Sequence, residues 1–317
     1  MIDATAVARR YTGAVGWPTV LLCVALTGAY VGVIVSWSTG VLPLWAGFII
    51  NAALTYAFYT VHHDANHKAI SGRNAKWRWL DAVCGEIAAV PLLLNFRGWS
   101  SEHLRHHSHT NDPARDPDVA LVAGPLWVVP LKWLAVTGIS TIATLPFCAP
   151  LMENAMAAQR PADAPPLTER VHNENRQLRR YMQLGVVVVL VSIPLGLFLP
   201  VFFLWWLPGR LGILALMVLF QWLPHVPYDS TARFGNTRIN TFRGSTWLLL
   251  QQDRHLVHHL YPSVPWYRYR ALFREIRPVL IAEGARIEGR DADPRRPITL
   301  RFPAASSSLA LRHEFAD

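Results

Sequence analysis

The sequence is poor in charged residues, which make up 16% of its 317 positions, while apolar residues make up 52%. A soluble domain usually carries more charge than this, so an ordinary water-soluble fold is excluded. Intrinsic disorder is excluded as well, because disordered chains are poor in apolar residues. The apolar residues gather in runs of about twenty, a length typical of membrane spans.

Cysteine is nearly absent. The three cysteines, Cys23, Cys84 and Cys148, form no CxxC pair, so the sequence offers neither a disulfide framework nor a thiolate metal site. The zinc-protease pattern HExxH is absent too. Any metal in this protein must therefore be held by nitrogen or oxygen ligands.

The apolar runs predict four transmembrane helices, at about 16–38, 44–61, 182–200 and 201–224. Prolines and the turn-like sequence Pro208-Gly209-Arg210 interrupt the last two, where we expect a short hairpin. Of the 30 Lys and Arg residues, 2 precede the first span, 13 lie at 68–180, 1 is Arg210 and 14 lie from Arg233 onward. By the positive-inside rule both termini and the long middle loop are cytoplasmic, and we expect a bacterial inner membrane.

Two other apolar segments are ambiguous. Segment 119–151 carries Lys132 and three prolines and could be a span, a re-entrant pair or an interfacial helix. Segment 79–94 is short and contains two acidic residues, which favours a helix lying at the interface. The sequence thus predicts an all-α integral membrane domain over residues 1–290 with a cytoplasmic helical cap, followed by a poorly ordered tail at 291–317.

Eleven of the thirteen histidines lie in four windows beside predicted spans: HHDANH at 62–67, HLRHHSH at 103–109, PH at 224–225 and HLVHH at 255–259. On a helix the spacings HxxxH and HxxHH place imidazoles on one stripe. Nine of these histidines have such a spacing or position, which is too many ligands for one ion, so the pattern predicts two metal ions. Imidazole binds zinc, copper, iron or nickel, so the residues do not identify the metal. The nine candidate ligands are His63, His67, His103, His106, His107, His225, His255, His258 and His259.

All four windows must reach one site, so the number of membrane crossings between His109 and His225 has to be even. Three apolar segments lie there, and segment 119–151 is the weakest span of the three. We therefore expect it to stay on the cytoplasmic side or to dip into the membrane and return.

The motifs HDANH, HLRHHSHTNDPARDPD and HLVHHLYPSVPWYRYR follow one another along the chain. With them the sequence resembles the membrane fatty acid desaturase and hydroxylase superfamily, whose hallmark is three histidine boxes. It is similar in particular to bacterial and cyanobacterial-type β-carotene hydroxylases, through GPLW at 124–127, LPHVP at 223–227 and the stretch 252–270. The resemblance covers roughly residues 44–280.

The resemblance implies a non-haem centre of two iron ions that uses O2 to attack an unactivated C–H bond of a lipid-soluble substrate. The nine histidines would be its ligands, and ring hydroxylation of a carotenoid is the reaction that the flanking motifs favour. Fatty acyl desaturation and alkene-forming fatty acid decarboxylation are alternatives on the same scaffold. Candidates for residues that orient the ligands are His62, Asp64, His109, Asn111 and Asp112.

Electrons must come from another protein, because the sequence has no GxGxxG, flavin or haem motif. The resemblance implies a ferredoxin or a similar donor. The net charge of +9 would attract an acidic donor or anionic lipid, and we expect no nucleic-acid partner. A metal transporter is a hypothesis of another class, but its ligands would lie near the bilayer midplane, whereas these flank the ends of spans.

Overall fold

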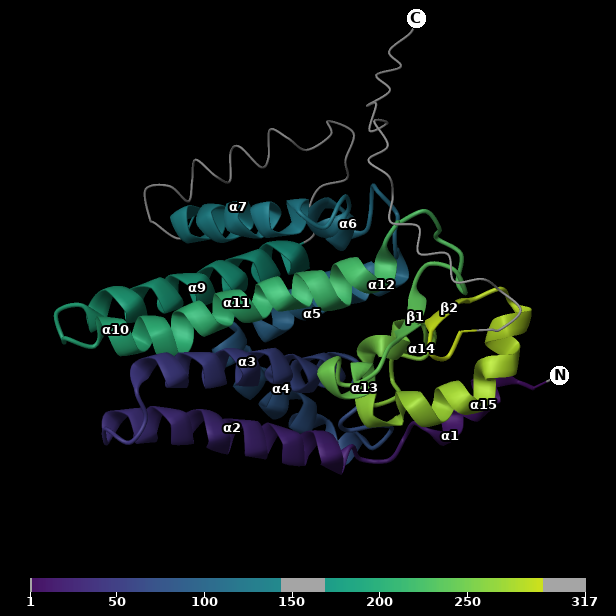
Figure 1. The fold of residues 1–317 in the computed structure, drawn as a ribbon, viewed down its shortest axis with the longest axis horizontal. Coiled ribbons are helices and arrows are strands. Elements are labelled where there is room, and N and C mark those ends of the chain that lie inside the picture. The colour runs from purple at the N-terminus through teal and green to yellow at the C-terminus, as the bar shows by residue number, and fades with distance from the viewer. Residues whose placement is uncertain (1, 144–168, 293–317) are drawn as a thin grey trace, which may run out of the picture.

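A computed structural model describes residues 2–143 and 169–292, and over these ranges the protein is mostly helical (Figure 1). Three helices are long and apolar enough to cross a membrane: α2 (Trp17–Ser38), α3 (Leu44–Asn66) and the continuous helix Phe198–His225. A bent pair of helices, α4 and α5, makes a fourth span if it crosses as one unit. The prediction of a helical membrane protein is confirmed. Among the described residues the predicted spans 16–38, 44–61 and 201–224 match candidate spans, whereas 182–200 does not, and the possible fourth span is the pair α4 and α5.

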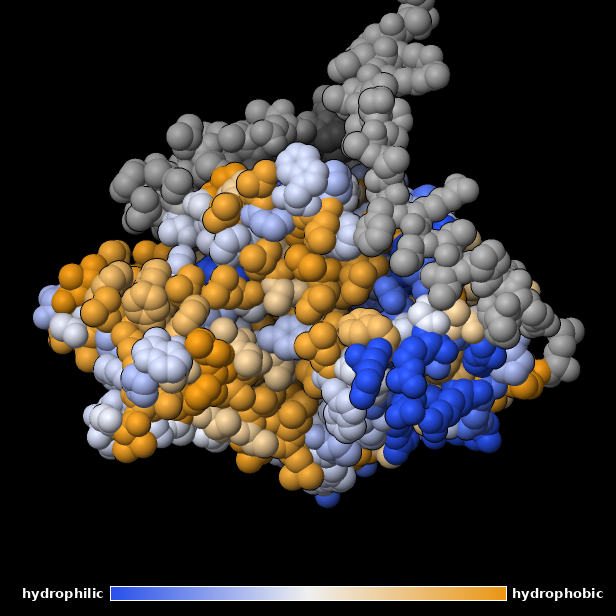
Figure 2. Space-filling model, viewed as in Figure 1, coloured by the Kyte–Doolittle hydropathy of each residue, from blue (hydrophilic) through white to orange (hydrophobic). Residues whose placement is uncertain are grey.

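The hairpin of α2 and α3 forms one side of the bundle. Helix α2 is apolar on every face, and its outward residues Leu21 and Val24 are 66% and 65% exposed. Such exposure suits lipid rather than water, because a helix that is apolar all round is a buried or membrane helix. The inward residues Leu26 and Tyr30 pack against α3 and neighbouring helices in one core cluster. Figure 2 shows apolar side chains over most of the bundle.

The predicted boundary between the third and fourth spans is wrong. Helix α9 (Glu169–Ser192) ends earlier, and the turn before α10 (Phe198–Val201) contains Pro194 and Gly196, whose positive φ of +69° suits glycine. The chain then stays helical to His225 through η2 (Phe202–Trp206), α11 (Leu207–Leu216), η3 (Met217–Trp222) and α12 (Leu223–His225).

Pro208 lies inside this long helix instead of ending it. The π-helical turn η2 directly precedes it, and there the Leu207 N–H donates to the Phe202 carbonyl five residues back. A proline usually breaks a helix because it lacks an N–H and its ring meets the preceding turn. The wider π turn accommodates the ring, so the helix continues.

For segment 79–94 the sequence predicts a helix at the membrane interface, but the structure packs it along a span. It forms α4 (Arg78–Leu92), which packs along α3 and turns through 97° into α5 (Phe96–Ser108). Its outer stripe is mostly apolar, with Trp79 54%, Val83 44% and Val90 52% exposed, and the acidic residue Glu86 is exposed on the same stripe. Asp81 is buried on the inner face, where its carboxylate accepts a hydrogen bond from the Ser71 N–H. This acidic residue therefore does not need contact with water.

Segment 119–151 contributes α6 (Pro117–Val122) and α7 (Val128–Ala143), which pack on η3 and α11. Lys132 donates to the carbonyls of Ala120 and Ala123 near the start of α7. At 16 residues α7 is about 24 Å long, short of a full span. The rest of the segment, from 144, lies outside the described residues, so the re-entrant path stays a prediction.

A cap covers the end of the bundle where the histidine windows lie. It contains α1 (Ala4–Arg10), η1 (Ala75–Trp77), β1 (Arg238–Thr241), α13 (Ser245–Leu248), η4 (Gln252–Arg254), α14 (His255–Leu260), η5 (Trp266–Arg268), α15 (Tyr269–Ala282) and β2 (Arg286–Gly289). Ile239, Leu256, Leu272 and Ile276 are fully buried in its core.

The cap also contains a feature that the sequence did not predict. β1 and β2 pair in parallel, with Ile239 opposite Ile287. The predicted tail lies outside the described residues from 293 onward, and a single domain over 1–290 stays a prediction.

The path of segment 119–151 can be tested by cysteine labelling. In a background without the native cysteines, Ala114→Cys and Gln159→Cys should react with a membrane-impermeant reagent from the same side, because an even number of crossings separates them. Measurement in sealed vesicles of known orientation checks this. Labelling from opposite faces would contradict the prediction and make the segment a true span.

Candidate metal centre

Four separate elements bring the nine candidate ligands to one end of the bundle. His63 lies in the last turn of α3, and His67 follows that helix directly. The second window lies on α5, His225 ends α12, and the third box begins α14. All nine imidazoles are buried or nearly so, although the four windows are separated by up to 195 residues.

Five of the imidazoles form one cluster, in which the candidate ligand nitrogens lie within 4.8 Å of one another. The Nε2–Nε2 distances are 3.0 Å between His63 and His258, 2.9 Å between His67 and His103, and 2.8 Å between His107 and His258. Cluster A consists of His63, His67, His103, His107 and His258.

The other four imidazoles form a second cluster beside the first. His106, His225 and His259 have ligand nitrogens within 4.8 Å of one another. The Nε2 of His255 lies 3.2 Å from that of His225 and 3.1 Å from that of His259. Cluster B consists of these four histidines. Clusters A and B adjoin, since the ring centroids of His107 and His259 are 4.2 Å apart.

Helical geometry divides the second and third boxes between the clusters. Residues four apart on a helix lie about 40° apart around its axis, so His103 and His107 share cluster A while His255 and His259 share cluster B. The histidine at the fourth position of each box points to the other cluster. His106 therefore belongs to B and His258 to A.

The remaining nitrogens of cluster B are held by side-chain oxygens. His106 Nδ1 lies 2.9 Å from an Asp116 carboxylate oxygen, and His255 Nδ1 lies 3.2 Å from Gln252 Oε1. His225 Nδ1 lies 3.2 Å from Asn111 Oδ1. The orientation of this amide follows from its nitrogen, which donates to two backbone carbonyls, at 2.6 and 2.9 Å. Carboxylate and amide oxygens only accept, so these Nδ1 atoms carry the protons.

In His225 and His255 the protonated Nδ1 leaves a bare lone pair on Nε2, and these two lone pairs point at each other. The contact between His225 and His255 at 3.2 Å then has no hydrogen to share. Burial lowers the pKa of His255 to about 3 and holds the pKa values of His258 and His259 well below their usual range, which keeps these rings neutral. Neutral imidazoles with converging lone pairs fit a metal cation, and the two groups fit a two-metal centre.

The candidate orienting residues have different surroundings. Asn111 faces His225, as described. Asp64 contacts no imidazole: it accepts from the Thr19 hydroxyl at 2.8 Å and the Trp266 N–H at 3.3 Å, which ties α2 and the cap to α3. The reason is its position after His63, about 100° further around the helix. The carboxylate of Asp112 accepts instead from Arg115 and from the Ala114 N–H.

Two further histidines also lie outside both clusters. His62 is buried between the rings of Phe96 and Trp99, with its Nδ1 3.2 Å from the Asn66 amide. His109 is half-buried and follows the last residue of α5.

The sequence did not identify Asp116 as a partner of a histidine. It lies in the run Arg115-Asp116-Pro117-Asp118, which follows the second histidine box. The structure buries Asp116 against His106, and its carboxylate also accepts the Asn111 N–H. Three other contacts to ring nitrogens were missed, because the motif spacing does not show which side chain faces a ring: Thr110 to His259, Gln252 to His255 and Tyr269 to His258.

Comparison with known proteins places this site in a family context. A model of the fatty acid desaturase family matches residues 36–289. The sn-1 oleoyl-lipid 12-desaturase of a Synechocystis species is 38% identical over 110 residues, covering 32% of this chain and 28% of that protein. The chloroplastic omega-6 fatty acid desaturase of Spinacia oleracea is 21% identical over 281 residues, covering 80% and 58%.

A third relative carries an electron donor in its name. It is the sn-1 acyl-lipid omega-3 desaturase (ferredoxin) of a Nostoc species, 28% identical over 69 residues that cover 22% of this chain and 18% of that protein. The chain spans about a quarter of the length of the 12-desaturases that it matches, 27% for the Picosynechococcus protein.

Metal content tests the assignment of the clusters. We expect about two iron ions per purified chain, as in other two-metal sites. His107→Ala should lose iron and all turnover, because ligands of one centre act as a unit. His109→Ala is the matched control, two residues along on the same helix end, and should keep both. Elemental analysis decides between these outcomes, and full iron content in His107→Ala would refute the assignment.

The carboxylate behind His106 provides a second test. Asp116→Asn keeps an oxygen but removes the negative charge that holds the Nδ1 proton, so iron affinity or turnover should fall about 10–100-fold. Asp112→Asn, four residues earlier and without contact to a ring nitrogen, should behave as wild type. Competition with a chelator measures the affinity. Equal iron retention in the two variants would show that Asp116 does not act on the metal centre.

Proposed function

The chain belongs to the fatty acid desaturase family, and from this premise we propose that it is a membrane-bound, O2-dependent diiron enzyme that introduces a double bond into the acyl chain of a lipid. The two adjoining imidazole clusters carry the proposal. The relatives named above are acyl-lipid and fatty acid desaturases, which favours this reaction over the carotenoid ring hydroxylation that the flanking motifs suggested.

Clusters A and B would each hold one iron ion through their Nε2 atoms. Two bound irons supply the means to activate O2 and remove hydrogen from an unactivated C–H bond. The protein's own residues fix the geometry: Asp116, Asn111 and Gln252 hold the Nδ1 protons, so each ring keeps one orientation. Rigid placement of this kind is what a reactive metal centre needs from its protein.

Aromatic side chains separate cluster A from the bundle. Trp99 stacks on His103 with ring centroids 4.3 Å apart. The ring centroid of Tyr59 lies 5.4 Å from those of both Trp99 and Phe220. Tyr59 is only 6% exposed, so this layer admits little water. An acyl chain that reaches the metals would lie in such dry surroundings, which limit side reactions with solvent.

The side of the membrane that holds the site is cytoplasmic in this proposal. Helix α1 packs against α15, so the N-terminal segment and the metal centre lie at the same end of the bundle. The basic residues of the sequence concentrate at this end, in agreement with the positive-inside rule. Both described ends of the chain would therefore face the cytoplasm.

An acidic electron-transfer protein fits the surface of the cap. Figure 2 shows a strongly hydrophilic patch there, and the exposed arginines of this region include Arg9, Arg243, Arg270 and Arg274, while Arg10 pairs with the exposed Glu275. A basic surface attracts an acidic donor such as a ferredoxin, and the attraction weakens as salt is added. Turnover with limiting donor should therefore fall with ionic strength, whereas a salt-independent rate would argue against docking by charge.

Expression in a bacterial host that accumulates β-carotene distinguishes the candidate reactions. Mass analysis of total fatty acids should show acyl chains that have lost two hydrogens, because desaturation removes them from neighbouring carbons. Carotenoids should be unchanged. A carotenoid that has gained oxygen would favour ring hydroxylation, and a terminal alkene one carbon shorter would favour decarboxylation. His107→Ala provides the inactive control, and products that persist in it would come from the host.

A further inference from the structure

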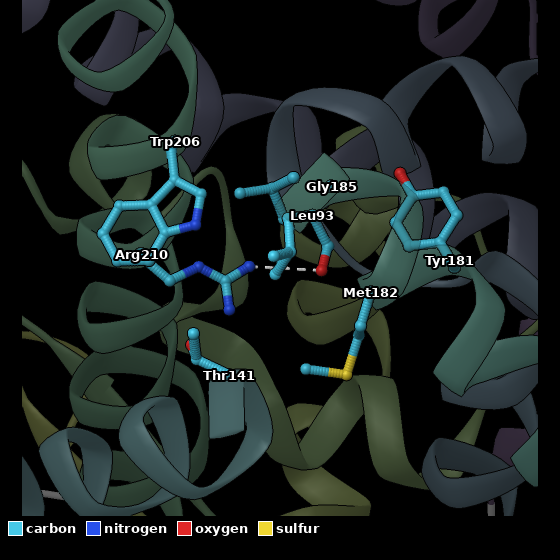
Figure 3. Close-up of a pocket in the computed structure, with 8 residues that line it drawn as sticks. Leu93, Thr141, Tyr181, Met182, Gly185, Trp206 and Arg210 are labelled. Carbon is cyan, nitrogen blue, oxygen red and sulfur yellow. Dashed lines mark hydrogen bonds between the residues drawn. The ribbon is translucent and has the colours of Figure 1, made fainter. Parts of the chain in front are cut away.

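A pocket lies between helices α7, α9 and α11, away from the metal centre. The space is small, about 30 Å³, which is room for a group the size of a water molecule or a carboxylate, and Figure 3 shows its lining. The walls include Leu93, Met182 and Trp206, which are apolar, and Tyr181 and Arg210, which are not. Arg210 is fifteen residues before His225 in one helix, so about 22 Å of helix separates the pocket from cluster B.

Arg210 uses only part of its hydrogen-bonding capacity within the protein. One terminal nitrogen donates to the Leu93 carbonyl at 3.2 Å, which helps to satisfy the end of α4. The Nε is buried and has no partner. Among the described residues no carboxylate forms an ion pair with it, and the pocket lining contains no acidic side chain. In Figure 3 the other terminal nitrogen points into the space between Thr141 and Met182.

The capping role alone does not account for this arginine. Two other side chains already serve the same helix end: the Tyr181 hydroxyl donates to the Ala89 carbonyl at 2.8 Å, and the Trp205 indole donates to the Val90 carbonyl at 2.9 Å. A guanidinium has five N–H donors and a permanent charge. Burying that charge without an anion is costly, so an ion pair from outside the chain would stabilise it.

The level of the pocket in the membrane indicates what the anion is attached to. Helix α9 is polar up to Arg180, and its apolar half begins at Tyr181, which lines the pocket. Beyond it Leu184 and Val187 are 60% and 50% exposed, as expected of a surface against lipid tails. Arg210 lies near the middle of the span Phe198–His225, so the pocket faces acyl chains, and an anion that reaches it must be carried on an apolar chain.

We propose that the Arg210 pocket binds the acidic end of an amphiphile, an oxyanion carried on an apolar chain. The planar guanidinium matches two oxygens of a carboxylate or a phosphate. The apolar walls of the pocket suit the first carbons of the attached chain. This ligand binds at a site separate from the metal centre, and its binding does not depend on the reaction that the enzyme performs.

Lipid retention tests the proposal on the intact protein. Wild type and variants are placed in phosphatidylcholine nanodiscs doped with oleic acid, dioleoylphosphatidic acid or uncharged methyl oleate, and retained molecules are counted by native mass spectrometry. Wild type should retain one acidic amphiphile that Arg210→Gln binds at least about tenfold more weakly. Arg210→Lys should keep much of the binding, and Arg233→Gln, an exposed arginine of the cap, should match wild type.

The doped lipids distinguish the two sources of the oxyanion. Retention of oleic acid alone identifies a carboxylate ligand, and retention of phosphatidic acid alone identifies a phosphate headgroup. Equal retention by wild type and Arg210→Gln, or equal retention of methyl oleate, would overturn the proposal.

If Arg210→Gln fails to insert, Gly185→Leu provides the same test. Gly185 lines the pocket, and a Cβ there would lie 3.8 Å from Leu93 Cδ2 and 3.9 Å from Trp205 Cη2, which are ordinary contacts, so a larger side chain at this position would reduce the space. It should abolish retention of the acidic amphiphile while the iron content stays at the wild-type value. Undiminished retention in this variant would overturn the proposal.

Discussion

The structure depends on the convergence of nine imidazoles at one end of the bundle. The Asn111 oxygen holds the Nδ1 proton of His225, so the Nε2 of that ring can only accept. Several such acceptors at one point are stabilised by cations between the rings. The clusters therefore need both a rigid scaffold and, in the function proposed here, two metal ions.

The scaffold brings the histidines together through one helix that continues past a proline and one pair of helices that bends sharply. The π-helical turn before Pro208 lets one helix continue to His225, and the bend of 97° between α4 and α5 turns the second box toward α3. The cap then places the third box on the remaining side, supported by a core that includes α1. Each device serves to bring a separate segment of chain to one point.

Two polar features in the bundle have different relations to this centre. Asp64 lies next to a proposed ligand in sequence but joins α2 and the cap instead. Arg210 lies far from the metals along its helix, and its charge is only partly used by the protein. For Asp64, proximity to a ligand in sequence was a poor guide to its contacts. Arg210 shows that a charged residue inside the bundle can indicate a separate binding site.

The sequence by itself determined the membrane class, the first two spans and the nine histidines, because hydropathy and the spacings HxxxH and HxxHH are local properties of the chain. It could not determine which histidine belongs to which cluster, since that depends on how α5 and α14 are rotated toward each other. It also misjudged Pro208 and Asp64, because the outcome there depends on a π turn and on partners distant in the chain. Tertiary packing decided these points, because contacts between residues 195 and 202 positions apart leave no local pattern.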